Sequence, residues 1–327
     1  MLAAYVTKLG PAEAIRVGEL PRPAPGPTDV LVRVELVVVN PVDTLVRSGA
    51  YPTPTPFPFV VGRDLVGTVA EAGPGVAGFA VGDRVWCNSL GHGGRQGSFA
   101  EYAVVPAERC YHLPAGVDPV AAVAVLHPAA TAHLALYRHG GLRPTETVYV
   151  AGAAGNVGTA LTSLARAGGA RVLAGARPED AGWCRSAGAA EVVDYRDPDL
   201  RGRLAALAPA GIDLYVDTSG HLDLPGAVEL LAERGRIVLI AGGSQRLTLP
   251  VGPLYRHDRR ILGFAISRAG VPELAEAAGV LNDRLAAGAL PARVRVVWPL
   301  ERAAEAHRAV ERGERGRTVL RVAPAEE

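Results

Sequence analysis

Three glycines with the spacing G-x-x-G-x-x-G lie between a predicted strand at 146–152 and a predicted amphipathic helix at 156–169. The turn comprises Gly152, Ala154, Gly155, Asn156, Val157 and Gly158. A tight strand-to-helix turn needs residues without Cβ, and the first N–H groups of the helix then present a positive dipole end to a phosphate. The pattern therefore predicts a turn that binds the pyrophosphate of a dinucleotide, with an ordinary tight turn as the competing interpretation.

The end of the following predicted strand, 170–177, bears on which nicotinamide cofactor binds. A carboxylate at this point accepts hydrogen bonds from a ribose 2′-hydroxyl and repels a 2′-phosphate. The strand instead ends in Arg177, and no acid occurs before Glu179. We expect Arg177 to bind the 2′-phosphate and Tyr195 with Arg196 to close over the adenosine, so the cofactor is expected to be NADPH. The alternative is that Arg177 is one more solvated arginine in a chain whose 34 Lys and Arg residues include a single lysine, Lys8.

The predicted elements that must position these residues change character twice along the chain. Within residues 1–122, short β-like runs alternate with turns, which predicts a partly closed antiparallel β domain. Within 123–258, strands alternate with helices, one of them predicted at 224–235, as in a doubly wound parallel sheet. Residues 259–327 return to mixed structure and are expected to complete the first domain. The predicted fold class is α/β, and we expect a small-molecule site where the two domains meet.

The composition is that of a folded globular protein, with 49% hydrophobic and 20% charged residues. A formal net charge of +1, without a basic stripe, gives no support for nucleic-acid or membrane-surface binding. No apolar run reaches roughly 18 residues, and the first residues do not have the pattern of a signal peptide. The three widely spaced cysteines fit a reducing compartment. We therefore expect a cytoplasmic protein whose partner is a small molecule, with no nucleic-acid or membrane partner.

Five longer segments, in order and spanning almost the whole chain, carry a more specific signal. They are NPVDTLVRSGAYP at 40–52, GRDLVGTVAEAGPGVAGFAVGDRVW at 62–86, GSFAEYAVVP at 97–106, AGAAGNVG at 151–158 and PLERAAEAHRAVERG at 299–313. Together they resemble the zeta-crystallin-like quinone oxidoreductases of the medium-chain dehydrogenase/reductase superfamily. The resemblance implies a GroES-like catalytic domain interrupted by a Rossmann domain, NADPH as cofactor, and a homodimer or homotetramer.

Zinc-dependent relatives in that superfamily hold a catalytic metal with a cysteine and a His-Glu pair. The matching positions in this chain are Asn40 for the cysteine, and Arg63 with Asp64 for the pair. A guanidinium has no lone pair to donate, and an amide is a poor substitute for a zinc thiolate. The structural zinc loop of those relatives also has no counterpart, because 87–99 contains a single cysteine. We therefore expect no metal site.

The resemblance also implies which residues line the site. Asn40, Asp43 and Tyr51 fall where the family lines its substrate pocket, so Tyr51 is expected to donate to the acceptor oxygen and Asn40 to orient it. Two alternatives stay open, namely a cap or loop hydrogen bond for Asp43 and a packing role above the cleft for Tyr51. The residues expected near the cofactor, besides the turn, Arg177 and Tyr195, are Thr131, Ala241, Gly242, Gly243, Phe264 and Ile266. A basic residue of the last segment is expected near a phosphate, with Arg317 as the candidate and the neighbouring Arg312 and Arg315 as alternatives.

Chemistry without a metal favours an acceptor that is already electrophilic. Alcohol oxidation benefits from a Lewis acid, whereas a quinone needs mainly positioning close to the nicotinamide. Quinone reduction by NADPH is therefore the leading prediction. Reduction of α,β-unsaturated carbonyls is the enzymatic alternative, and a non-enzymatic crystallin-like or RNA-binding protein is the alternative from another class.

Overall fold

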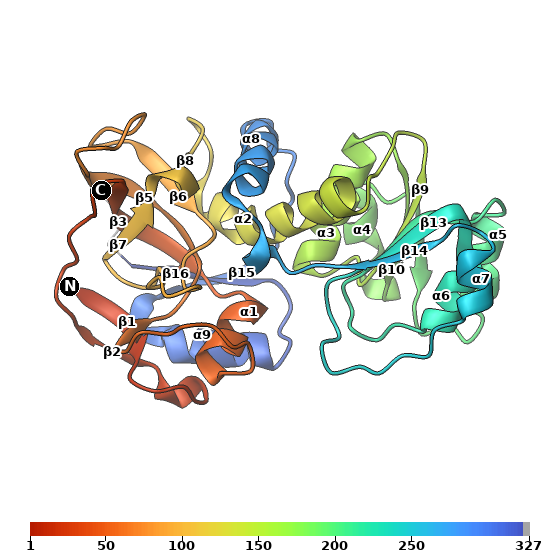
Figure 1. Cartoon of the computed structure of the whole chain (residues 1–327), viewed down its shortest axis with the longest axis horizontal. Helices are drawn as coiled ribbons and strands as arrows, with labels where there is room; N and C mark the ends of the chain where they lie inside the picture. Colours follow the sequence, from red (N-terminus) through yellow and green to blue (C-terminus); the bar gives the residue numbers. More distant parts are fainter. Residues whose placement is uncertain (323–327) are drawn as a thin grey trace. The chain divides into compact units, whose positions relative to one another are not determined.

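The computed structural model describes residues 1–322 and divides the chain into two compact units (Figure 1). Unit 1 consists of Met1–His127, Gly270–Gly288 and the chain from Ala292 onward, and unit 2 consists of Pro128–Ala269 and Ala289–Pro291. The predicted domains changed at 122 and at 258, slightly earlier than these transitions. The difference at the first transition arises because α2 (Pro119–His133) begins in one unit and ends in the other. The last predicted segment, 259–327, includes residues 323–327, which lie outside the described part.

Unit 1 is built on two β-sheets. The larger has the order β15-β16-β3-β5-β6-β8, with β7 also paired to β3. Its strands are β3 (Asp29–Val38), β5 (Asp64–Ala72), β6 (Arg84–Cys87), β7 (Tyr102–Pro106), β8 (Tyr111–His112), β15 (Val294–Pro299) and β16 (Arg317–Arg321). The smaller sheet joins β2 (Arg16–Glu19), β1 (Leu2–Val6) and β4 (Phe59–Val60). Pairing is antiparallel except between β15 and β16, so the predicted antiparallel β domain is confirmed with one parallel pair added.

Most of the C-terminal segment after residue 270 lies in unit 1. Figure 1 shows β16 and α9 (Ala303–Glu311), coloured blue, among the red and orange elements of the N-terminal part, and α9 packs against α1 (Pro41–Ser48). The unit also contains α8 (Val271–Ala286). Apolar side chains from β1, β3, β5, β6 and α9 form one core.

Helix α1 was not predicted, although the sequence contains the residues that cap it. Asn40 has an extended backbone at the N-cap, its N–H donates to Asp43 Oδ2 at 2.7 Å, and Pro41 occupies the first turn. Gly49, with φ +87°, ends the helix in the left-handed conformation. Eight residues are too few to give a convincing helical period, so only these caps could have revealed the helix.

Unit 2 contains a six-stranded, wholly parallel sheet with the order β11-β10-β9-β12-β13-β14. Its strands are β9 (Thr147–Ala151), β10 (Arg171–Ala176), β11 (Glu191–Asp194), β12 (Ile212–Asp217), β13 (Leu231–Leu239) and β14 (Arg260–Gly263). Its helices are α3 (Asn156–Ala167), α4 (Ala181–Ser186), α5 (Leu200–Leu207), α6 (Leu224–Leu230) and α7 (Val251–Tyr255). This strand order is that of a Rossmann sheet, which confirms the predicted doubly wound domain.

One predicted helix of unit 2 is wrong in its second half. The apolar spacing at 224–235 predicted a single helix, but α6 ends at Leu230 and β13 begins at Leu231. Leu231 is buried and pairs with Ile212 of β12, and Arg234 takes a φ of +60°, which no helix accommodates. Pairing within the sheet therefore overrides the local helical pattern.

The segment Pro119–His139 is the one helical stretch of residues 1–322 long and apolar enough to cross a membrane. Most of it is buried inside the structure, as is usual for the core helix of a globular protein.

Candidate functional site

The glycine turn predicted from the sequence connects β9 to α3 in unit 2. Gly152 has a φ of +78°, and a Cβ on Gly158 would lie 2.2 Å from Gly152 O, so both positions require glycine. Helix α3 begins at Asn156, and its N-cap, Gly155, provides no side-chain cap. The first N–H groups of the helix therefore remain available to an oxyanion. The shape of the turn fits the diphosphate of a dinucleotide.

Thr218 supports this turn and was missed by the sequence analysis. It follows β12, which pairs directly with β9, and its Oγ1 donates to Ala151 O at 2.7 Å. The preceding Asp217 is buried and accepts hydrogen bonds from Ser219 Oγ at 2.6 Å and from Gly220 N at 3.2 Å. The signal was an acid and two hydroxyl residues at a strand end, DTSG, which the structure places beside the reversal of strand order between β9 and β12.

Arg177 and Tyr195 come together at the ends of two neighbouring strands. Arg177 follows β10 and Tyr195 follows β11, and Arg177 Nε donates to the Tyr195 hydroxyl at 2.8 Å. Both side chains are exposed. Glu179 Oε1 lies 3.8 Å from Arg177 Nη1, while the adjacent Arg196 is occupied by a bidentate contact with Asp194. The pair therefore offers a guanidinium and an aromatic ring to a ligand at this edge.

Five other residues expected near the cofactor lie on the same edge of the sheet, because they follow parallel strands. Ala241, Gly242 and Gly243 come after β13, and Phe264 and Ile266 come after β14. The Phe264 ring stacks on the His139 ring, with centroids 4.3 Å apart. Thr131 lies in the part of α2 that belongs to unit 2 and is buried.

A cluster of buried polar residues lies in unit 1, at one end of its larger sheet. Because β3 pairs antiparallel with β5 and β16, the end of β3 lies beside the starts of both other strands. Asn40 follows β3, Arg63 precedes β5, Asp64 begins β5 and Arg317 begins β16. Each of these side chains is at most 4% exposed. The topology thus brings together residues that are distant in the sequence.

Hydrogen bonds fix the orientation of two members of this cluster. Arg317 Nη2 donates to Asn40 Oδ1 at 2.7 Å, and Asn40 N donates to Asp43 Oδ2 at 2.7 Å. Arg63 Nε lies 3.8 Å from Asp43 Oδ1. Asp43 therefore caps α1 and also faces a guanidinium, which supports the cap interpretation and leaves its place in the substrate pocket a prediction.

Arg317 requires a correction. The sequence analysis placed it near a phosphate of the cofactor, but its guanidinium is enclosed in unit 1 and bonded to Asn40. Attraction to Asp43 and Asp64 offsets part of the cost of burying this cation. Because its Nη2 is bonded to Asn40, which belongs to the cluster in unit 1, we assign Arg317 to that cluster and not to the phosphate.

Burial shifts the protonation of the carboxylates and of a neighbouring histidine. It raises the pKa of Asp43 to about 6, against the attraction of Arg63. The pKa of Asp64 is raised well above its usual range by burial and by the charge of Asp43. Burial, aided by Arg63, lowers the pKa of His127 to about 3. His127 Nδ1, 3.7 Å from Asp64 Oδ1, is therefore part of a neutral imidazole at physiological pH and not of an ion pair.

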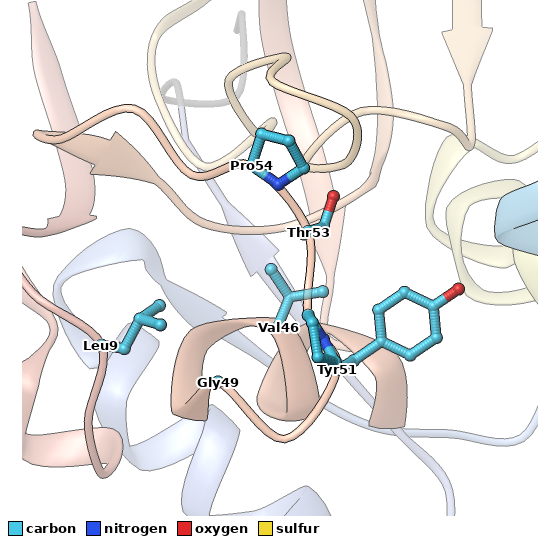
Figure 2. A pocket seen from close by; sticks show the side chains of 7 residues that line it. Leu9, Val46, Gly49, Tyr51, Thr53 and Pro54 are labelled. Atoms are coloured by element: carbon cyan, nitrogen blue, oxygen red, sulfur yellow. The ribbon is translucent and has the colours of Figure 1, made fainter.

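Tyr51 lines a cavity of about 430 Å³ in unit 1, next to the end of α1. Leu9, Val46, Gly49 and Pro54 are among the other lining residues (Figure 2). In Figure 2 the Tyr51 ring extends away from Leu9, so its hydroxyl does not point at the apolar wall formed by that residue. The ring centroid lies 5.8 Å from that of His92.

Asn40, Arg63 and Asp64 stand at the positions of the zinc ligands in the zinc-dependent relatives, but together they do not form a set of zinc ligands. Across residues 1–322, no three His, Cys, Asp or Glu side chains are grouped so that they could hold a metal ion. Arg63 at the histidine position is a cation, which repels a metal ion.

Two family matches cover most of the chain. Residues 26–115 match the family described as alcohol dehydrogenase GroES-like domain, and residues 156–281 match the one described as zinc-binding dehydrogenase. The quinone oxidoreductase of Sus scrofa is 31% identical over 98% of this chain and 97% of its own length.

Solved structures agree with both units. An NAD-dependent alcohol dehydrogenase superposes with a TM-score of 0.89 at 32% identity, covering 99% of this chain and 100% of its own. The quinone oxidoreductase of Escherichia coli in complex with NADPH superposes with a TM-score of 0.85 at 25% identity, covering 98% of this chain and 100% of its own.

A GroES-like unit joined to a Rossmann sheet with a dinucleotide turn defines a medium-chain dehydrogenase/reductase, and this chain is one. Within that superfamily it belongs to the quinone oxidoreductase, or zeta-crystallin, family, as the sequence predicted. It is accordingly an NAD(P)-dependent oxidoreductase that acts on a small molecule.

Proposed function

We propose that this protein is an NADPH-dependent quinone oxidoreductase that needs no metal ion. The observation that carries the proposal is the pair Arg177–Tyr195, which takes the place of a ribose-binding carboxylate at the end of β10. Relatives named quinone oxidoreductase, about 30% identical over nearly the whole chain, support the choice of acceptor.

Different residues of the chain are assigned to different parts of the cofactor. The N–H groups at the start of α3 hold the diphosphate, and Arg177 with Tyr195 holds the 2′-phosphate and the adenosine. Thr131, the backbone at Ala241–Gly243, Phe264 and Ile266 bound the nicotinamide end. When bound, the reduced nicotinamide supplies the hydride.

Acceptor binding is assigned to unit 1. Tyr51 donates a hydrogen bond to the acceptor oxygen, Asn40 orients the acceptor, and Asp43 holds Asn40 through its main-chain N–H. A quinone is reduced in such a pocket without a Lewis acid, because its carbonyl groups already accept charge. The cationic side chain of Arg63 at the zinc-ligand position supports a metal-free reaction.

Reduction of an α,β-unsaturated carbonyl is the second candidate, since the same hydride geometry serves an activated alkene. A panel of quinones and enones, measured with NADPH and with NADH, distinguishes the two. Prompt oxidation of NADPH by quinones and not by enones supports the proposal. Faster turnover of enones contradicts it, and failure to bind either cofactor favours a non-enzymatic role.

We further propose that the chain forms a homodimer or homotetramer in the cytoplasm, as the family resemblance implies. Light scattering coupled to size-exclusion chromatography measures the mass directly. A single species of 33.9 kDa, the mass of one chain, contradicts the assembly.

A further inference from the structure

Arg63 has a guanidinium that is enclosed yet forms no hydrogen bond with any residue of 1–322. Its side chain is 2% exposed, and neither Nε nor Nη2 has an acceptor. Asp43 Oδ1, at 3.8 Å from Nε, is beyond hydrogen-bond distance. Since a guanidinium stays protonated in proteins, Arg63 is a buried cation with unused donors.

The backbone holds Arg63 in this position. Gly62 has a φ of +94°, and a Cβ there would lie 2.1 Å from the Phe99 ring, so only glycine fits. Leu90 N donates to Arg63 O at 3.3 Å, and β5 begins at the next residue. Local constraints on both sides therefore keep the side chain inside the unit.

Several polar groups of the same cluster also have unsatisfied hydrogen-bonding atoms. Asn40 Nδ2, Arg317 Nε and both carboxylate oxygens of Asp64 form no hydrogen bond of normal geometry among the described residues, although Asn40 lies close enough to Asp64 to lower the pKa of that carboxyl. Asn40 cannot turn its amide over without losing the bond from Arg317 to its Oδ1. Tyr51, assigned to the acceptor pocket, acts electrostatically on Arg63 and raises its pKa, although burial has the larger, opposite effect.

Arg47, a second buried arginine of unit 1, has a structural role and is the comparison for Arg63. It is 1% exposed in the same unit, but its Nε donates to Gly10 O at 3.1 Å and its Nη2 bonds to Glu311, so that only Nη1 lacks a partner, whereas Arg63 has no hydrogen bond from either Nε or Nη2. Buried donors left unused cost free energy, so they call for a partner that the chain does not supply. Two guanidiniums and an amide N–H₂ favour an oxygen atom with negative charge.

We propose that Arg63 is a catalytic residue whose guanidinium donates a hydrogen bond to the acceptor oxygen as that oxygen becomes negative. This inference rests on the proposed quinone reduction. The hydride, with its two electrons, passes from the nicotinamide to the quinone, and the nicotinamide ring is oxidised. One quinone oxygen is then left as a phenolate, which Arg63 stabilises until a proton from solvent completes the hydroquinone.

The kinetic test uses Arg63→Met, which keeps the length of the stem, and Arg63→Lys, which keeps the charge opposite Asp43 and Asp64. Arg47→Met is the matched control. With NADPH and 1,4-naphthoquinone, we expect kcat to fall about 100-fold in Arg63→Met, as for loss of an oxyanion donor, with a smaller fall in Arg63→Lys. Arg47→Met should lower the unfolding midpoint and leave the kcat of the folded protein close to wild type.

A spectroscopic test follows the oxyanion itself. 4-Nitrophenol is added to the NADP⁺-saturated protein at a pH where the free phenol is mostly protonated. Wild type and Arg47→Met should raise the phenolate absorbance, and Arg63→Met should not. Equal phenolate absorbance and equal kcat in wild type and Arg63→Met would overturn the inference.

The outcomes separate this inference from the proposed function. Normal quinone turnover by Arg63→Met leaves quinone reduction standing and removes Arg63 from it. Stabilisation of the phenolate by Arg63, in a protein that turns over no quinone, supports the oxyanion site and refutes quinone as the acceptor.

Discussion

Arg177 Nε donates a 2.8 Å hydrogen bond to the Tyr195 hydroxyl, across the ends of the adjacent parallel strands β10 and β11. The sequence has no carboxylate that would select NADH at this strand end, and the Tyr195 hydroxyl orients a cation there instead. Under the proposed function, the preference between the two cofactors depends on this one exposed guanidinium.

Replacing Arg177 with glutamine should lower the affinity for NADPH by about 10-fold, the value of one hydrogen bond to a charged group, and leave NADH binding unchanged. Isothermal titration calorimetry measures both constants. Arg171→Gln is the matched control, because Arg171 is exposed at the other end of β10. Equal NADPH affinity in wild type and Arg177→Gln would show that Arg177 is merely a solvated side chain.

Gly158→Ala should destabilise unit 2 by about 1–3 kcal/mol and abolish the stabilisation by NADPH, because the added Cβ would lie 2.2 Å from Gly152 O. Urea unfolding with and without NADPH measures both effects. Gly182→Ala, in α4 of the same unit, is the control, since a Cβ there meets no atom within 4 Å. A stable Gly158→Ala variant that still binds NADPH is inconsistent with the assigned turn.

The doubly wound sheet was predictable because its strands are apolar runs ending in turn residues, and Gly152, Gly155 and Gly158 mark the tight turn between β9 and α3 directly. The cluster of buried polar residues in unit 1 was not predictable from the sequence. The sequence shows that Arg63 cannot bind zinc, but the electrostatic interaction of Asp64 with Arg317 depends on pairing between strands far apart in the chain. For the same reason Arg317 was assigned to a phosphate, and Thr218 was overlooked although it bonds to Ala151 O.

Stability should fall in mild acid because His307 is buried in a neutral form. Neither ring nitrogen has a hydrogen-bond partner within residues 1–322, and burial, aided by Arg47, lowers the pKa of His307 to about 3 from an ordinary 6.5. The folded-state pKa lies below the unfolded one, so this contribution is complete above pH 6.5. It is lost at about 1.4 kcal/mol per pH unit as the pH falls towards 3.

His307→Leu should remove that dependence, so its unfolding free energy should decline less than that of wild type between those pH values. Urea titrations at several pH values measure the difference. His221→Leu, at an exposed histidine, should follow wild type. Parallel curves for wild type and His307→Leu would mean that His307 is protonated without cost in the folded protein.

Tyr51→Phe should lower kcat with quinones by roughly 10-fold, since it removes a hydrogen bond to the developing oxyanion, and should leave the Kd for NADPH unchanged. Tyr102→Phe in the same unit is the control, because the Tyr102 ring packs under Arg22, 4.2 Å from its guanidinium. Stopped-flow oxidation of NADPH separates the chemical step from product release. An unaltered rate would leave Tyr51 with the packing role alone.

The proposed reaction is the transfer of a hydride from NADPH to a quinone without a metal ion. The most direct measurement is the steady-state kcat/KM for 1,4-naphthoquinone, with NADPH and with NADH, after exhaustive treatment with a chelator. We expect turnover to be the same before and after chelator treatment. We also expect kcat/KM to be at least 10-fold higher with NADPH than with NADH, as for one charged contact to the 2′-phosphate. Activity lost to the chelator and restored by zinc, or a preference for NADH, would contradict the proposed reaction.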